Sequence, residues 1–219
     1  MTGNEMITTL GLRLEDPAGS VFTSATIVEA LNTAQRTVVN TIHNNYLAEL
    51  QSIEGDKNPS TGTAGQMTYA AASVAPIRNG IVGIYDDTND KWCTMIEPGE
   101  IKGQENSYLS GDTSAPVAWT FGESIYVRPT TIALIDIWYI KAPTALAASG
   151  SECDLNISLQ EILLDFAEAQ LWRMDAKAER GNVAYSNAMN MVKILNERYA
   201  VDRISGLGAL GRKCLYKFH

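Results

Sequence analysis

Apolar residues recur every three or four positions from about residue 23 to residue 53, a spacing that places them on one face of a helix. The residues on this face are Ile27, Leu31, Ala34, Val38, Ile42, Tyr46, Leu50 and Ile53. Thr26 and Glu29 have the spacing of a capping box, and Ser24 is an alternative cap. The pattern predicts an amphipathic helix that ends before Gly55, followed by a loop through residue 65.

Between about residues 66 and 141 the pattern changes to the alternation of β-strands. The polar run 86–90 separates two apolar stretches and predicts a hairpin, whose Asp and Asn residues suit a turn better than a calcium loop. The Gly-Glu pair at 122–123 separates two further strands and suits a type II′ turn. Residues 132–141 are apolar on both faces, which predicts a central strand. The polar stretch 97–116 predicts a long solvated excursion.

Helical spacing returns after residue 156. Ser158 and Glu161 have capping-box spacing, and the apolar stripe that follows is wide enough to be covered on two sides. Gly181 and Asn182 predict a break or a kink before a further amphipathic stretch. Because a helix cannot bury its stripe alone, the first helix should pack on the helices of residues 157–200 across the β region.

These patterns predict an α+β fold, in which a helical bundle of three main amphipathic helices carries an inserted antiparallel β region and an extended C-terminal tail. The predicted domain limits are a discontinuous helical body, a β insertion and a docking tail. They comprise residues 1–65 with 146–203, residues 66–145, and residues 204–219.

Composition narrows the class of protein. The 219 residues hold 17 Lys and Arg against 25 Asp and Glu, a net charge of −8, which argues against a protein that coats DNA. No apolar run approaches the ~18 residues of a membrane-spanning helix. The N-terminal residues lack the basic and apolar regions of a secretory signal, so secretion by that route is not expected.

Candidate chemistry is sparse. Cys93, Cys153 and Cys214 are far apart and, with only two histidines in the chain, form no metal set, which favours free packed thiols in a reducing compartment. His43 falls within the predicted first helix, and Asp136 within the central strand, where a structural role is favoured. The sequence therefore predicts no enzyme activity, cofactor or metal site.

The C-terminal segment differs in charge from the rest. Residues 203–219 hold four Lys or Arg and no acid, which leaves a net charge of −12 on the remainder. The glycines at 206, 208 and 211 match a dinucleotide fingerprint as a string, but a helix precedes them and only eight residues follow, so we reject that interpretation. A cationic, aromatic segment of this kind is suited to anchoring in another subunit.

Several local patterns resemble the head-to-tail adaptor (connector, or head-completion) proteins of tailed bacteriophages, especially the short-tailed kind. They are the capped helix start at 24–32, the stretch 121–129 leading into 137–143, and then Leu146 with the short runs 159–163 and 167–169. The resemblance covers about residues 10–200. The loop at 60–65 and the excursion at 97–116 are not matched.

The resemblance implies a virion protein that forms a ring, usually of twelve copies, beneath the portal at the head-tail junction, assembled in the host cytoplasm. It implies C-terminal extensions that dock on portal subunits, a tail nozzle or tail-tube protein as the other partner, and genomic DNA passing through the lumen without sequence-specific binding or any membrane contact. An acidic body would repel the DNA backbone. The residues predicted to dock on the portal are Leu210, Arg212, Lys213, Leu215, Tyr216 and Phe218.

A rival function is a binding module. Trp92, Trp119, Tyr126 and Trp138 lie in the β region and could form an aromatic platform for a glycan, although core packing is the commoner role of such residues.

Overall fold

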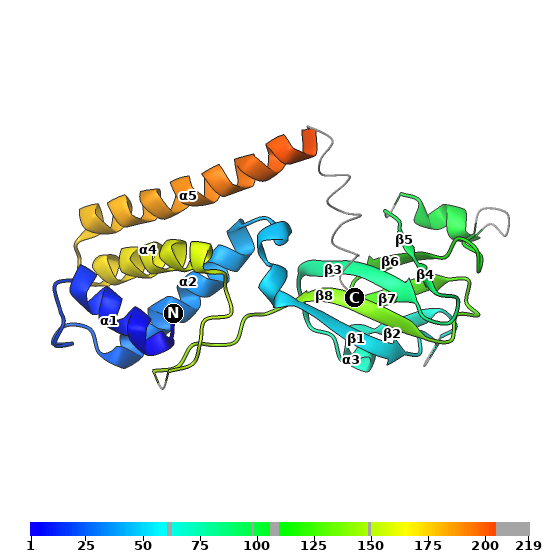
Figure 1. Cartoon of the computed structure of the whole chain (residues 1–219), viewed down its shortest axis with the longest axis horizontal. Helices are drawn as coiled ribbons and strands as arrows, with labels where there is room; N and C mark the ends of the chain where they lie inside the picture. The colour runs from blue at the N-terminus through cyan, green and yellow to red at the C-terminus, as the bar shows by residue number, and fades with distance from the viewer. Residues whose placement is uncertain (61–62, 98, 106–109, 149, 205–219) are drawn as a thin grey trace. The chain divides into compact units, whose positions relative to one another are not determined.

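The computed structural model of the chain (Figure 1) describes residues 1–60, 63–97, 99–105, 110–148 and 150–204. They form an α+β fold of helices and two β-sheets, as predicted. The chain divides into two compact units. The helical unit comprises Met1–Glu49 and the described residues that follow Ala142, and the sheet unit comprises Leu50–Ala142.

The helical unit is built around one central helix, α4. Its main helices are α1 (Gly3–Arg13), α2 (Ser24–Thr41), α4 (Ile157–Met174) and α5 (Ala178–Ile204). Helix α4 packs on each of the other three (Figure 1), and α2 packs on α4 as predicted. Its wide apolar stripe is buried on more than one side, which confirms that prediction. The buried apolar side chains include Leu159, Ile162, Leu163, Phe166, Leu171 and Trp172.

Helix α1 was not predicted. It begins with a capping box in which the Thr2 hydroxyl accepts from the backbone N–H of Glu5, and the Glu5 carboxylate accepts from that of Thr2. Met6 and Leu10, one turn apart, are both 0% exposed. Gly3 weakens the helical pattern in the sequence, yet it is required here, because a Cβ atom would lie 2.4 Å from the carbonyl oxygen of Ala147.

The prediction that the helix beginning near residue 24 runs to residue 53 is wrong. Helix α2 ends at Thr41, where the side chain of Asn196 on α5 donates to the carbonyl oxygen of Thr41 and accepts from the backbone N–H of His43. Two short 3₁₀-helices follow, η1 (Asn44–Tyr46) and η2 (Ala48–Leu50). The apolar residues beyond Thr41 keep helical spacing in the sequence. The helix nevertheless ends there, where Asn196, about 150 residues further along the chain, binds its last turn.

The other helix limits also differ from prediction by a few residues. The N-caps are Thr23 for α2 and Asn156 for α4, each a short polar residue whose side chain accepts a backbone N–H. The break before α5 falls at Ala176, whose φ is +57°, and not at Gly181. Gly181 lies inside α5 where this helix packs on α4. A Cβ atom at this position would be 2.9 Å from the carbonyl oxygen of Ala169, so the close packing requires glycine.

The sheet unit contains two four-stranded sheets. The first sheet has the order β1-β8-β3-β4, and its strands are β1 (Gln51–Lys57), β8 (Ile135–Lys141), β3 (Pro76–Asp86) and β4 (Lys91–Trp92). The second sheet has the order β2-β7-β6-β5, and its strands are β2 (Gln66–Thr68), β7 (Ser124–Arg128), β6 (Val117–Phe121) and β5 (Thr94–Met95). A four-residue helix, α3 (Tyr69–Ala72), follows β2, and a 3₁₀-helix, η3 (Ile101–Glu105), lies in the excursion.

The predicted strand pairs are present. Strands β3 and β4 form the hairpin around residues 86–90, and β6 and β7 form the hairpin around Gly122, whose φ is +58°. Strand β8 is central in the first sheet, between β1 and β3. Strand β5 pairs parallel to β6, so the second sheet is mixed and not purely antiparallel. The core lies between the two sheets, with Ile84, Ile135 and Ile137 from the first and Ile125 and Val127 from the second.

The loop between α1 and α2 is organised by one buried carboxylate. Asp16 accepts from the backbone N–H groups of Ser20, Val21 and Phe22 at 2.8, 2.8 and 2.9 Å, and from the Ser20 hydroxyl at 2.6 Å. These hydrogen bonds hold the pKa of Asp16 well below its usual range, and the hydrogen bond from the Ser20 hydroxyl has the largest effect. The ionised carboxylate therefore stabilises the entry into α2.

We expect Asp16→Asn to be less stable than the wild type at pH 7. A folded pKa below the unfolded value gives stability that is present above about pH 4 and is lost as the pH falls through the folded pKa. Thermal unfolding at pH 7, 4 and 2 should therefore show a difference between the two proteins that shrinks as the pH falls. A difference that stays constant down to pH 2 would contradict a role for the charge.

Candidate assembly surfaces

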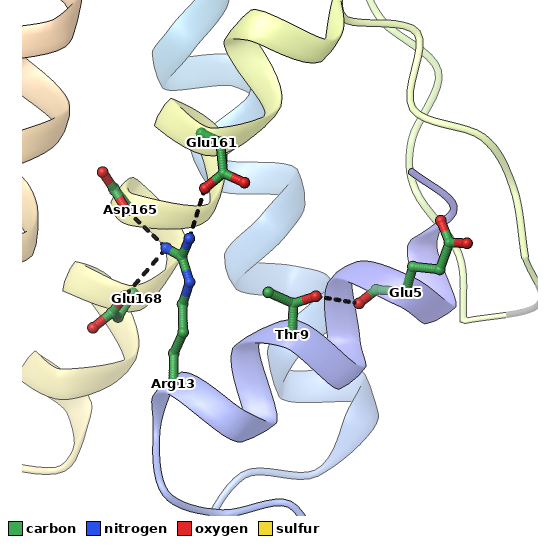
Figure 2. Close-up of polar contacts among 6 residues, drawn as sticks. All are labelled: Glu5, Thr9, Arg13, Glu161, Asp165 and Glu168. Carbon is green, nitrogen blue, oxygen red and sulfur yellow. Dashed lines mark hydrogen bonds and ion pairs between the residues drawn. The ribbon is translucent and has the colours of Figure 1, made fainter.

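A single arginine joins α1 to α4. Figure 2 shows the Arg13 guanidinium directed at three carboxylates of α4, at 2.6 Å from Glu161, 2.8 Å from Asp165 and 3.5 Å from Glu168. The three acids are spaced four and three residues apart, so they share one face of the helix. Glu168 also accepts from the indole N–H of Trp172. The three carboxylates that Arg13 contacts all belong to one neighbouring helix of the same unit. We therefore assign Arg13 a structural role, as an internal brace between α1 and α4.

Burial and charge act against each other in this brace. Burial raises the pKa of Asp165, although Arg13 favours its ionised form. Burial lowers the pKa of Arg13, but the hydrogen bonds and charges of Asp165 and Glu161 outweigh it, so the Arg13 pKa is raised. The arginine stays charged and offsets the repulsion among the three carboxylates.

Helix α5 leaves one apolar face open. It packs on α4 through the small buried residues Gly181, Ala184 and Ala188. On another face of the helix Val183, Met191 and Ile194 are exposed, Val183 to 63%. Exposed apolar residues that follow one helix face are typical of a surface that contacts another protein.

An open groove of about 370 Å³ lies between α2, α4 and α5. Its residues include Phe166 and Tyr185, whose ring centroids are 5.6 Å apart. The Arg173 guanidinium lies 5.0 Å from the centroid of the Tyr185 ring. The groove and the exposed face of α5 are both in the helical unit.

A row of large side chains crosses the face of the first sheet that lies opposite the core. Ile53 of β1 is in register with Trp138 of β8, and Tyr85 of β3 is in register with Trp92 of β4. The Trp92 ring bridges the two pairs, with its centroid 5.2 Å from that of Tyr85 and 5.7 Å from that of Trp138. We name these four residues the outer row. Ile53 is 48% exposed and Trp92 38%, so the row reaches solvent.

A second aromatic stack lies on the other sheet. The rings of Trp119 and Tyr126 are parallel within 3° at 5.3 Å, and the Arg128 guanidinium lies 5.4 Å from the Trp119 ring centroid. Gln66 donates to the Tyr126 hydroxyl. Trp119 is buried, so its ring contributes to packing. The four aromatic residues of the predicted glycan platform are thus placed as two pairs on two different sheets.

The remaining candidate residues have structural partners. His43 is not within a helix but caps η1, where its Nδ1 accepts from the backbone N–H of Asn45. Asp136 accepts from the backbone N–H of Asp56 at 3.1 Å, which agrees with a structural role. Burial, then the charge of Asp86, raises the pKa of the Cys93 thiol to about 12, and burial also raises that of Cys153. Both are free thiols, as predicted.

A family model described as SU10 adaptor protein matches residues 1–210. The chain belongs to the SU10 adaptor protein family. The resemblance to phage head-to-tail adaptors is thereby confirmed, and a phage adaptor is a structural component of the virion. A search of curated proteins gives no match.

The predicted docking residues of this adaptor family member are not placed by the structure. Leu210, Arg212, Lys213, Leu215, Tyr216 and Phe218 all lie outside the described residues. Of these six, only Leu210 is within the residues that the family model matches. Portal docking by this segment stays a prediction.

Two further observations concern the described part of the chain. None of its helices is both long enough and apolar enough to cross a membrane. In the same residues, no group of three or more His, Cys, Asp or Glu is placed to hold a metal ion. The outer row is not predicted as one surface by the sequence, because the apolar spacing predicts a helix through Ile53, whereas Ile53 lies in strand β1.

Proposed function

We propose that this protein forms a ring, of twelve copies by analogy with phage adaptors, that joins the portal to the tail. Genomic DNA passes through its lumen without sequence-specific binding, and the cationic C-terminal segment docks on portal subunits. The observation that carries the proposal is the family match over residues 1–210. On the tail side, the partner is a nozzle or tail-tube protein, and assembly takes place in the host cytoplasm.

The distribution of charge supports the proposal. Residues 1–202 have a net charge of −12, whereas residues 203–219 carry four cations and no acid. An acidic body repels the phosphate backbone, which suits a passage along which DNA moves without adhering. A ring also needs contacts between copies, and the exposed apolar face of α5 is suitable for such a contact.

The portal contact can be tested with two aromatic residues of the segment. We expect the double variant Tyr216→Ala, Phe218→Ala to bind portal rings at least thirtyfold more weakly, because buried aromatic anchors contribute about 2 kcal/mol or more at interfaces. The measurement is a titration of the cognate portal, with electron microscopy of the assemblies that form.

The matched control is Phe121→Ala, which removes an aromatic ring from the tip of the β6–β7 hairpin, where Phe121 is 68% exposed. This control should bind the portal like the wild type. Unchanged portal affinity of the double variant would overturn the docking role of the segment, and a failure of the wild-type chain to form rings with the portal would overturn the proposed function.

A further inference from the structure

The outer row gathers three aromatic rings on the face of the first sheet that lies opposite the core. Tyr85, Trp92 and Trp138 form a continuous set of rings, extended on one side by Ile53. The inner face of the same sheet is already covered, since Ile84, Ile135 and Ile137 pack in the core between the sheets. The outer row lies on the opposite face, where its rings pack on one another and Ile53 and Trp92 reach solvent.

Three acidic side chains lie near Tyr85, at one end of the row. Asp90 accepts a hydrogen bond from the Tyr85 hydroxyl, and Asp136 follows the same outward alternation on β8, next to Trp138. Asp87 is exposed in the β3–β4 turn. The carboxylates of Asp90, Asp87 and Asp136 all act on Tyr85, and the hydrogen bond to Asp90, with these charges and burial, raises its pKa to about 12. Residues 50–142 as a whole hold eleven acids and six bases.

An aromatic surface with acidic side chains at one end selects a particular kind of ligand. Lysine and arginine are attracted to the faces of tryptophan and tyrosine and to nearby carboxylates, while aromatic side chains pack between exposed rings. Residues 205–219 of this chain have that composition: three Lys or Arg, a tyrosine and a phenylalanine within the last eight residues, and no acid.

We propose that the outer row is the docking surface for residues 205–219 of a second copy of this chain. The inference deepens the proposed function, and it rests on it, because it names one contact through which copies of the adaptor join. Segment and sheet are different surfaces, so each copy can give its segment to one neighbour and receive that of another. Such a head-to-tail contact generates a closed ring or a filament. The portal would then compete with the neighbouring sheet for the same segment.

The first test uses a fluorescent peptide of residues 205–219 and the full-length chain, followed by fluorescence anisotropy. We expect the peptide to bind, and Trp92→Ala to weaken its binding about tenfold, since Trp92 is the central ring of the row. Phe121→Ala, which removes an exposed ring from the second sheet, should leave binding unchanged. Thermal unfolding of both variants checks that the sheet unit is intact. Equal binding by wild type and Trp92→Ala, or no binding, would overturn the proposal.

The second test separates a contact between copies from one within a chain. Sedimentation equilibrium of the full-length chain without portal should show self-association that excess peptide reverses. Asp87→Lys should weaken this association about threefold, and combining it with Lys213→Glu should restore part of the loss, because the charges are exchanged. A chain that binds the peptide but stays monomeric at every concentration would overturn the second copy as the occupant.

Portal binding tells the two proposals apart. Trp92→Ala alters only the sheet, so it should bind portal rings as the wild type does, while it loses self-association. The Tyr216→Ala, Phe218→Ala variant should lose both. If that variant loses self-association but keeps its portal affinity, the result would support the outer row as the docking surface and would contradict portal docking by the segment.

Discussion

Leu163→Ala should lower the free energy of unfolding by about 2–5 kcal/mol, the largest effect of a single substitution that we expect in this protein. Leu163 is 0% exposed and lies on α4, the helix on which α1, α2 and α5 all pack. Truncation removes apolar contacts and leaves a cavity, because the helices packed around α4 can move only partly into the space. Urea unfolding followed by circular dichroism would measure the loss.

The matched control is the same substitution at Leu12 on α1, which is 64% exposed. Because Leu12 buries little surface and alanine favours helices, we expect a change within about 0.5 kcal/mol. A loss at Leu163 no larger than that at Leu12 would show that α4 is not the centre of the helical core.

Arg13→Met should destabilise the protein by about 1–3 kcal/mol at pH 7. Methionine keeps much of the apolar stem but leaves Glu161, Asp165 and Glu168 on one face of α4 without their shared cation. Asp165 and Glu168 are 24% and 20% exposed, so water screens their repulsion only in part. Urea unfolding at pH 7 would measure the effect.

The pH dependence of this variant has a definite sign. Burial already raises the pKa of Asp165, and removal of the cation should raise it further. A carboxyl group whose folded pKa lies above its unfolded value binds protons more tightly in the folded state, so the loss should shrink as the pH is lowered from 7 toward 4. Arg36→Met, at an exposed position on α2, is the control and should show little loss at either pH. An equal loss at both pH values for Arg13→Met would assign its effect to packing alone.

Local sequence patterns predicted those elements whose partners are close in the chain. The β6–β7 hairpin follows from glycine at the first turn position, and the β3–β4 hairpin from the acidic run between two apolar stretches. The apolar character of both faces predicted that β8 is central. The wide stripe of α4 likewise predicted a helix covered on more than one side.

The errors share a physical cause. The capping box of α1 is visible in the sequence, but the apolar pattern that follows it is too short to predict a helix. The helix is stabilised by the burial of Met6 and Leu10 in the folded protein. Gly181 resembled a helix break, yet its missing Cβ allows close packing between α5 and α4. In both cases tertiary packing overrode the local propensity of the residues.

By itself the sequence determined the α+β class, the hairpins, the central strand, the family and the separation of acidic body from cationic end, because these depend on residue type, short-range spacing and overall charge. Only the tertiary structure decided where α2 ends, since Asn196 of α5 holds its last turn, and which faces the sheets leave open. It also assembled the outer row from three separate stretches of chain. Contacts between residues far apart in sequence fix these features, and periodicity within one segment does not encode them.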